Sequence, residues 1–345
     1  MASSRSRIKV VAVTAAAVVA LGVGVGTASA GTRDHWWGSR PAKPIASASR
    51  APSAPPVTTV TTPRASTSPR STASTRPTST RATTSPRATT SPTPSTSPKA
   101  TTVAWAAPPA NANFDYQIGA PYPPPSGVTV VTRDYTVSPA TGAGMYNICY
   151  VNAHQVQPGA DSWWQANHPE LLLRDARGQL VIDEDWDEVM LDYSTAAKRA
   201  ALTGVVSGWL GACASKGYQA VELDNLDSFG RSKGLLSEAQ SVAYATSLTT
   251  AAHGKGLAVG QKNTAELTTT QSRGVGFDFA VAEECGQWDE CGEYTRTYGN
   301  KVIVIEYTSA GFTKACNAFG SKLSIVQRDV NVTAPGSKAY VRKAC

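Results

Sequence analysis

A single (β/α)8 barrel of the TIM type is the fold that this sequence predicts for residues 110–345. Short apolar, β-branched runs alternate there with helical stretches, which is typical of βαβ units on a parallel sheet. The region holds about 235 residues, close to the roughly 250 of such barrels. Neither G-x-G-x-x-G nor G-x-x-x-x-G-K-[ST] follows a strand, which disfavours the alternative of an open, doubly wound sheet.

Two segments precede the predicted barrel. Residues 1–30 combine a basic start, an apolar run over 10–25 and Ala-Ser-Ala at 28–30, which indicates a signal peptide and a secreted, extracellular protein. The alternative is an uncleaved membrane anchor, but the apolar run is short for a membrane span. We therefore expect no stable membrane insertion after cleavage. Residues 31–109 are rich in Ser, Thr, Pro and Arg and have little to bury, which predicts a disordered linker.

The barrel region contains more candidate strands than a closed barrel needs. Helices are predicted over 195–215 and 237–254. Nine strands are one more than a closed barrel of eight takes, so either an end strand lies outside the barrel or one of the nine segments is not a strand. The predicted strands are 114–119, 128–135, 145–152, 188–194, 218–225, 257–263, 277–284, 301–307 and 323–329.

The charge of the chain is divided unevenly. The formal net charge is +7, but residues 106–345 carry 19 Lys/Arg and 24 Asp/Glu, a balance of −5. An acidic folded part disfavours nucleic acid as a partner and favours a neutral or cationic substrate.

All six cysteines lie in the barrel region, and an even number in an exported protein predicts disulfides. Of the fifteen possible pairings we expect Cys285–Cys291 as a local clip, Cys316–Cys345 at the tail, and Cys149–Cys213 by elimination. A cysteine metal site is the alternative, but Cys-x5-Cys has no second matching pair and no nearby histidine, so no metal is predicted.

Most of the predicted strands end in a polar or ionisable residue. In a barrel these ends converge on the face where active sites are built. A single Asp after a strand is more often a turn or cap residue, but seven strands with such ends favour a site. The residues are Asp134, Asn152, Asp192, Asp224, Lys262, Glu283, Glu284 and Glu306.

The segment AVELDNLDS carries the densest group of carboxylates. Period-2 alternation directs Glu222 and Asp224 to the lumen, and Asn225 and Asp227 follow at the strand end. Carboxylates this close repel one another, so the pKa of one rises, as a general acid requires. The alternatives are a structural cluster or a Ca²⁺ site, although the spacing does not match a calcium loop.

A second carboxylate pair stands in FDFAVAEECGQWDEC, at Glu283 and Glu284. Glycoside hydrolysis uses two carboxylates, one to protonate the leaving oxygen and one as nucleophile or base. If Phe277 and Phe279 face the helices, strict alternation directs Glu284 into the lumen; Glu283 then requires a bulge. Aromatic side chains that could stack on sugars are Trp163, Trp164, Trp288, Tyr135 and Tyr150, although core packing accounts for many such residues.

The segments VELDNLDS, GLAVGQKN, FDFAVAEECGQWDEC and VIVIEY, in this order, resemble the barrel of glycoside hydrolase family 114. The resemblance implies endo-α-1,4-polygalactosaminidase activity on a cationic amino-sugar polymer. Matched residue by residue, it implies Asp224 and Glu283 as the catalytic pair. It also implies a substrate groove lined by Asn225, Asp227, Lys262, Asn263 and Glu306.

We therefore expect a secreted, monomeric glycoside hydrolase that needs no cofactor. Further substrate-binding residues are expected at Glu222, Glu284, Asp134, Asp192 and Tyr150. The alternatives are a hydrolase of another α-linked glycan and a non-catalytic barrel that binds carbohydrate or the cell wall. A binding protein has no need to hold two carboxylates in a catalytic geometry, which distinguishes it from the enzyme.

Overall fold

A computed structural model describes residues 104–345 of the chain. The predicted signal peptide and nearly all of the predicted linker lie outside the described residues. The elements in chain order are β1 (Phe114–Gln117), β2 (Val130–Asp134), β3 (Tyr146–Asn152), α1 (Asp161–Asn167), η1 (Pro169–Leu171), β4 (Ile182–Asp183), β5 (Glu188–Val189), α2 (Ala196–Lys216), β6 (Ala220–Asp224), η2 (Leu226–Arg231), α3 (Glu238–His253), β7 (Ala258–Lys262), α4 (Thr269–Val275), β8 (Phe279–Glu283), α5 (Cys291–Tyr298), β9 (Val302–Glu306), α6 (Ser309–Phe319), β10 (Ser324–Arg328) and β11 (Arg342–Ala344).

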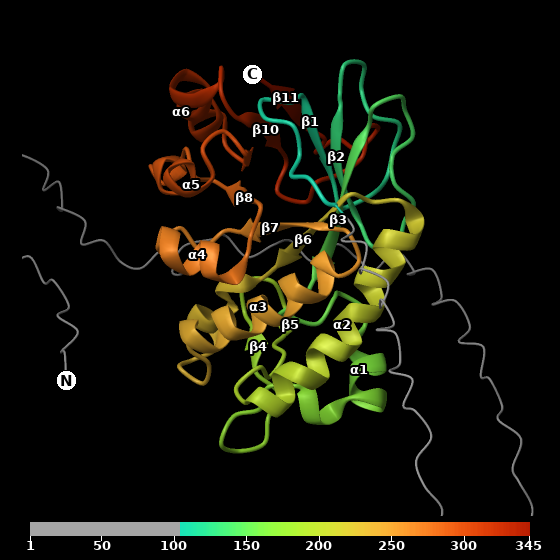
Figure 1. Cartoon of the computed structure of the whole chain (residues 1–345), viewed down its shortest axis with the longest axis vertical. Helices are drawn as coiled ribbons and strands as arrows, with labels where there is room; N and C mark the ends of the chain where they lie inside the picture. Colours follow the sequence, from blue (N-terminus) through green and yellow to red (C-terminus); the bar gives the residue numbers. More distant parts are fainter. Residues whose placement is uncertain (1–103) are drawn as a thin grey trace, which may run out of the picture. The chain divides into compact units, whose positions relative to one another are not determined.

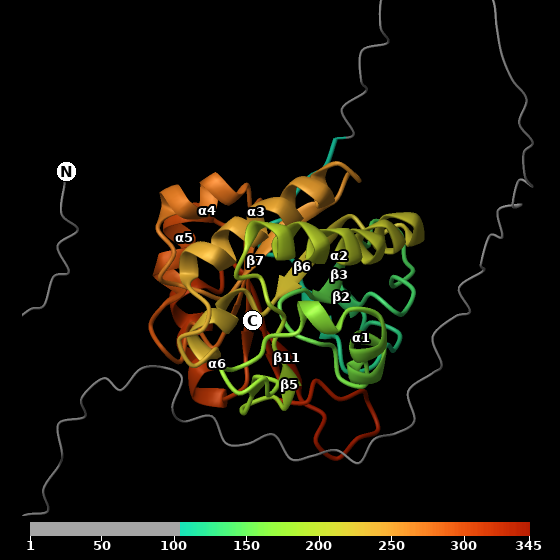
Figure 2. The same cartoon turned by 90° about the horizontal axis from the view of Figure 1, so that it is seen from below.

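Eight of the described strands form the predicted barrel. They pair in parallel in the order β1-β2-β3-β6-β7-β8-β9-β10, and β11 adds to β10 in the antiparallel direction. Helices α2, α3 and α4 lie along the outside of the strands (Figure 1, Figure 2). Between β1 and β2, and between β2 and β3, the described chain crosses without an α-helix. The (β/α)8 prediction is confirmed.

Charged side chains join the first strand to the last two. Asp115 of β1 forms ion pairs with two arginines: its Oδ1 lies 3.1 Å from Nε of Arg342 in β11 and 3.5 Å from the buried guanidinium of Arg328 in β10. Arg342 also donates to the carbonyl of Phe114. These contacts tie β1 to β10 and β11 where no strand ladder joins β1 to them.

The prediction of a barrel strand over 188–194 is wrong. Only Glu188 and Val189 form a strand there, and it pairs with β4 in a separate two-stranded sheet. The apolar run Val189, Met190 and Leu191 is buried in the core beneath α2. A continuous apolar run is also typical of a central parallel strand, which is buried on both faces of its sheet. The two cases have the same sequence pattern, which explains the error.

The two long helices predicted between strands are confirmed. α2 begins after Thr195, whose side chain accepts from the backbone N–H of Lys198, and ends at Gly217 in the left-handed conformation. α3 begins at a capping box formed by Ser237 and Gln240. None of the helices within residues 104–345 has the length and apolar character needed to cross a bilayer.

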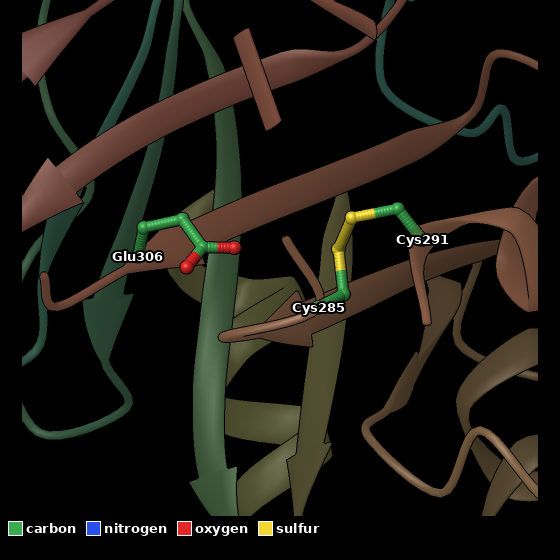
Figure 3. Close-up of side chains that lie close together, drawn as sticks. All are labelled: Cys285, Cys291 and Glu306. Atoms are coloured by element: carbon green, nitrogen blue, oxygen red, sulfur yellow. A yellow bond between two sulfur atoms is a disulfide. The ribbon is translucent and has the colours of Figure 1, made fainter. Parts of the chain in front are cut away.

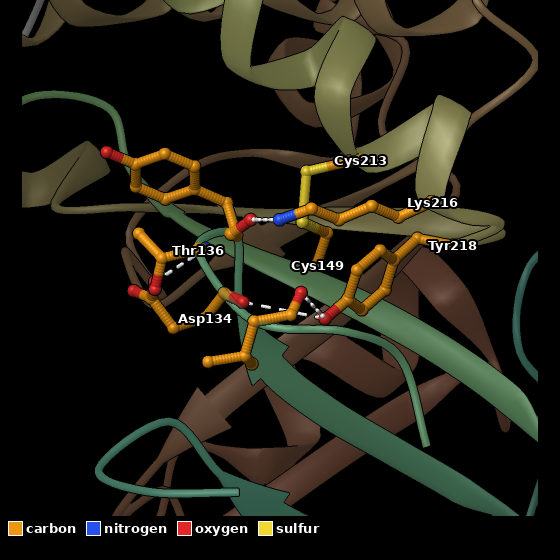
Figure 4. Close-up of a disulfide and its surroundings, with 8 residues drawn as sticks. Asp134, Thr136, Cys149, Cys213, Lys216 and Tyr218 are labelled. Carbon is orange, nitrogen blue, oxygen red and sulfur yellow. Dashed lines mark hydrogen bonds between the residues drawn. A yellow bond between two sulfur atoms is a disulfide. The ribbon is translucent and has the colours of Figure 1, made fainter. Parts of the chain in front are cut away.

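All three predicted disulfides are present. Figure 4 shows Cys149 of β3 joined to Cys213 of α2, beside Lys216, which donates to the carbonyl of Tyr135. This disulfide links the barrel wall to the first long helix. A cross-link of this kind restricts the unfolded chain, by roughly 2–4 kcal/mol in typical cases.

The lumen changes from apolar to polar along the strands. Phe114, Ile148, Ala258 and Phe279 belong to one buried apolar cluster inside the barrel. Gly260 leaves room for the ring of Phe279, because a Cβ atom at Gly260 would lie 2.8 Å from that ring. The polar residues stand at the carboxyl ends of the strands, above this layer.

Candidate active site

The ammonium group of Lys262 lies at the centre of a polar cluster at the end of β7. Its Nζ is 2.9 Å from Glu222 Oε1, 3.1 Å from Asp224 Oδ1 and 3.6 Å from Glu283 Oε2. It also donates to the hydroxyl of Tyr116 at 3.2 Å. Three carboxylates from β6 and β8 thus share one buried cation.

Asp224 is held from three sides. Tyr150 of β3 donates to its Oδ2 at 2.6 Å, and the backbone N–H of Asn225 donates to Oδ1 at 2.7 Å, beside Lys262. Val221 and Leu223 pack in the core outside the barrel, so the predicted lumen-facing side of this strand is confirmed. Deeper in the lumen, Glu222 accepts from Tyr116 at 2.7 Å.

Glu283 points into the same cluster. Asn263 donates to its Oε2 at 3.0 Å, and the Tyr307 hydroxyl donates to Oε1. The backbone N–H of Glu283 in turn donates to Asn263 Oδ1 at 2.9 Å. Asn263 therefore fixes both the main chain and the carboxylate of Glu283.

The bulge that we expected before Glu283 is absent. β8 pairs in regular register with β7 and β9. Phe279 and Val281 face the lumen, whereas Ala280 and Ala282 pack outside, so unbroken alternation brings Glu283 inward. The error was to assign Phe279 to the helix side; Gly260 makes room for it in the lumen.

Three of the strands end in the same backbone conformation. Asn225, Asn263 and Glu284, which directly follow β6, β7 and β8, all have positive φ, between 52° and 65°. Such left-handed residues are uncommon outside glycine and cluster at functional sites. Each one turns the chain away from the barrel immediately after a lumen-facing charged residue.

Burial and charge act on the groups of this cluster together. Burial lowers the pKa of Lys262, but Asp224, Glu222 and Glu283 outweigh it, and the pKa stands well above its ordinary value. Burial raises the pKa of Glu222, Lys262 opposes the rise and the neighbouring Asp224 adds to it. The repulsion expected between the two carboxylates of β6 therefore raises the pKa of Glu222, but burial raises it more.

Asn225 and Asp227 belong to an adjoining cluster built on Arg231. The guanidinium of Arg231 contacts Asp227 at 3.1 Å, donates to Asn225 Oδ1 at 2.9 Å and also bonds Asp183. Burial raises the pKa of Asp227, and Arg231 opposes that rise. This cluster supports the turn that follows Asp224.

Four other predicted site residues make their contacts elsewhere. Asp134, at the end of β2, accepts from Thr136 (Figure 4). It also accepts from Gln157. Asp192 accepts from Ser194 and Lys198 at the start of α2, and the barrel strand that was expected to present it does not exist. Glu284 lies in the loop after β8, where its backbone N–H donates to the carbonyl of Ile305. Glu306 lies behind this loop and accepts from the backbone N–H of Gly286.

Two tyrosines of the cluster were missed in the sequence. Tyr116 shares the lumen face of β1 with Phe114, and Tyr307 follows the last residue of β9. Alternation along FDYQ and VIVIEY could have found both. Of the aromatic residues considered for stacking, Trp164 is fully buried, whereas Trp163 and Trp288 are exposed.

A group of possible metal ligands stands outside this cluster. Figure 3 shows Cys285, Cys291 and Glu306 side by side, with the two sulfurs joined in a disulfide. Disulfide sulfurs are not thiolates, so this group lacks the ligands that a thiolate metal site uses.

Comparison with known proteins adds three findings. The family model described as glycoside-hydrolase family GH114 matches residues 94–345. The crystal structure of Ega3 from Aspergillus fumigatus in complex with galactosamine is similar, with 22% identity, a TM-score of 0.57, and coverage of 72% of this chain and 100% of that one. The glycoside hydrolase domain of PelA from Pseudomonas aeruginosa gives 16% identity, a TM-score of 0.46, and coverage of 66% and 97%. Among curated proteins there is no match.

The likeness to Ega3 shows a shared barrel fold. The family match covers most of the chain and includes every residue in contact with Lys262. The protein therefore belongs to glycoside-hydrolase family GH114.

Proposed function

We propose that this protein is a secreted hydrolase that cleaves α-1,4-linked galactosamine polymers, with Asp224 and Glu283 as its catalytic pair. The observation that carries the proposal is the shared contact with Lys262. Its ammonium group contacts both carboxylates, which lie at the carboxyl ends of β6 and β8, the two strands on either side of β7. Active sites of such barrels are built on this face. A pair of carboxylates held this close can act on a single glycosidic bond.

The proposed mechanism gives the two carboxylates complementary tasks. One donates a proton to the leaving glycosidic oxygen, and the other acts as nucleophile or as base for water. Tyr150 and Asn225 hold Asp224, while Asn263 and Tyr307 hold Glu283, so both groups are oriented before substrate binds. Lys262 contacts both carboxylates, so a single positive charge lies beside each member of the pair.

An amino-sugar polymer suits the charge of this site. Residues 106–345 have a balance of −5, and the Lys262 cluster holds three carboxylates for one cation. Ammonium groups on a sugar chain are attracted by such a field. The structure of Ega3 was determined in complex with galactosamine, which supports the same substrate class here.

Secretion and a monomeric state are part of the proposal. The first thirty residues have the pattern of a signal peptide, and three disulfides are expected in an oxidising compartment. One chain supplies every side chain of the Lys262 cluster.

A substrate panel tests the proposed specificity. Reducing-end release is measured on α-1,4-linked galactosamine polymer, its N-acetylated form and a neutral α-1,4-glucan. We expect the highest kcat/KM on the free amino polymer and a decrease as ionic strength rises, because screening weakens the attraction. Equal rates on the neutral glucan would contradict the assigned substrate class, and no release from any of the three would contradict the enzyme.

A further inference from the structure

Glu306 is a buried carboxyl group that the mechanism above does not use. It ends β9 and faces away from the lumen, since Ile303 and Ile305 occupy the lumen side. Its Oε1 accepts from the backbone N–H of Gly286 at 2.6 Å. Its Oε2 is buried and has no hydrogen-bond partner among the residues that the structure describes. Burying a carboxyl oxygen without a hydrogen-bond partner costs free energy, so the retention of this group calls for an explanation.

The space around this carboxyl depends on two glycines. A Cβ atom at Gly311, in α6, would lie 2.2 Å from Glu306 Oε2. A Cβ atom at Gly286 would lie 2.8 Å from Oε1 and 2.7 Å from the Cβ of Ala315. The loop and the helix can therefore close around Glu306 only because both positions lack a side chain.

The loop that Glu306 holds begins immediately after Glu283. The N–H of Glu284 donates to the Ile305 carbonyl at 2.7 Å, and the Cys285–Cys291 disulfide closes the loop at its far end. Figure 3 shows the Glu306 carboxylate beside that disulfide. The contact with Gly286 fixes the middle of this turn, three residues after the carboxylate proposed for catalysis.

Glu306, the last residue of β9, and Tyr307, which follows it, thus lie on opposite sides of the chain that leads away from β9. Tyr307 donates directly to Glu283 Oε1 in the lumen. Glu306 binds the backbone behind the strand. Tyr307 thus orients the side chain of Glu283, and Glu306 holds the loop that follows Glu283 in the chain.

We propose that Glu306 is a positioning residue for Glu283: it anchors the loop after β8 through Gly286 and so keeps the Glu283 carboxylate in the geometry required for catalysis. The inference rests on the proposed catalytic role of Glu283. It replaces the groove-lining role that the sequence predicts for Glu306.

The ionisation of Glu306 supports this role. Burial raises the pKa of this carboxyl to about 7. The backbone N–H of Gly286 opposes the rise, Glu284 adds to it, and the backbone N–H of Gln287 opposes it to a smaller extent. The charged groups acting on it within the described part of the chain are Glu284, from the loop, and Lys314, from α6. A carboxylate accepts more strongly than a carboxylic acid, so the anchor is firmest above about pH 7.

Two substitutions of the full chain separate anchoring from simple folding. Glu306→Gln keeps an acceptor oxygen for Gly286 but cannot ionise, whereas Glu306→Ala removes the acceptor. Asp278→Asn is the matched control, because Asp278 also accepts from a backbone N–H, that of Val259, at the opposite end of the barrel. We expect Glu306→Ala to lower kcat at least tenfold with little change in KM, and Glu306→Gln to recover most of that loss. The control should leave kcat unchanged.

The pH profile and amide exchange complete the test. The ratio of wild-type kcat to that of Glu306→Gln should rise as pH passes through about 7, and hydrogen exchange of the Gly286 amide should be faster in Glu306→Ala. Unchanged exchange overturns the proposal whether or not the polymer is cleaved. Faster exchange with an unaltered kcat overturns it as well, because the loop then moves without affecting catalysis. A wild-type protein that cleaves no polymer contradicts the proposed function instead, and exchange still decides whether Glu306 anchors the loop.

Discussion

The Nζ of Lys262 lies 3.1 Å from Asp224 Oδ1, and its side chain is 1% exposed. A buried lysine is normally expensive, because burial disfavours its charge. Here Glu222, Asp224 and Glu283 surround it and keep it protonated. The strand ends of β6, β7 and β8 are consequently linked by a single charged group.

Replacing Lys262 with methionine should abolish activity and weaken the fold. Removing one partner of a buried ion pair typically costs about 3–5 kcal/mol, because Glu222 would remain buried without its cation. Urea unfolding and polymer cleavage of Lys262→Met measure the two effects. In the double variant with Glu222→Gln we expect much of the stability to return but no activity. Full recovery of activity in that double variant would show that Lys262 has only a structural role.

Removing either tyrosine hydroxyl at the catalytic pair should slow the reaction. A hydrogen bond to a charged group is worth roughly 1.5–3 kcal/mol, which corresponds to about a tenfold to hundredfold loss in kcat. Tyr150→Phe and Tyr307→Phe are compared with Tyr298→Phe, which loses a bond to Gln261 outside the barrel. The control should keep its kcat. If all three variants slow equally, the loss reflects general loosening of the barrel rather than orientation of the carboxylates.

Gly260→Ala should destabilise the barrel by about 1–3 kcal/mol, because its Cβ atom would overlap the ring of Phe279. Thermal unfolding of this variant is compared with that of Gly208→Ala, on an exposed face of α2 where no atom lies within 4 Å. The helical control should gain about 0.5–1 kcal/mol. Phe279→Leu, combined with Gly260→Ala, should restore part of the stability. An unaltered melting temperature in Gly260→Ala would contradict the proposed close fit.

The ionisation of Glu306 should make stability depend on pH. Its pKa is about 7 in the folded protein, against an ordinary value of 4.5. The folded state therefore retains a proton that the unfolded state has released between these values, so this contribution is complete below pH 4.5 and is lost as pH rises to 7. The loss reaches at most about 3 kcal/mol. Urea unfolding of wild type and Glu306→Gln from pH 4 to 8 should show the variant gaining relative stability up to pH 7. A constant difference would contradict the raised pKa.

Much of the fold could be predicted because local patterns and the global fold agree. Hydrophobic period and segment length predict the eight parallel strands of the barrel and the two long helices. The number and positions of the cysteines predict the three disulfides. The lumen position of Glu222 and Asp224 follows from alternation, since small and apolar residues flank them in an unambiguous order.

The errors arose where tertiary packing decides the direction of a side chain. Met190 and Leu191 are buried as a central strand would be, but beneath a helix. Phe279 enters the lumen only because the neighbouring strand has glycine at position 260. Glu306 stands one residue before Tyr307 and so points to the other side of β9, where two glycines admit it. The first two relationships are not local in sequence, whereas the outward direction of Glu306 follows from the alternation along β9.

The central claim is that Asp224 and Glu283 together hydrolyse the polymer. Reducing-end release from α-1,4-linked galactosamine polymer is measured for wild type, Asp224→Asn, Glu283→Gln, the double variant and Glu170→Gln, whose carboxylate is 63% exposed. General acid–base and nucleophilic groups each contribute about a hundredfold or more, so both single variants should lose at least that, the double variant little more, and the control nothing. A folded Asp224→Asn or Glu283→Gln that retains the wild-type rate would contradict the account.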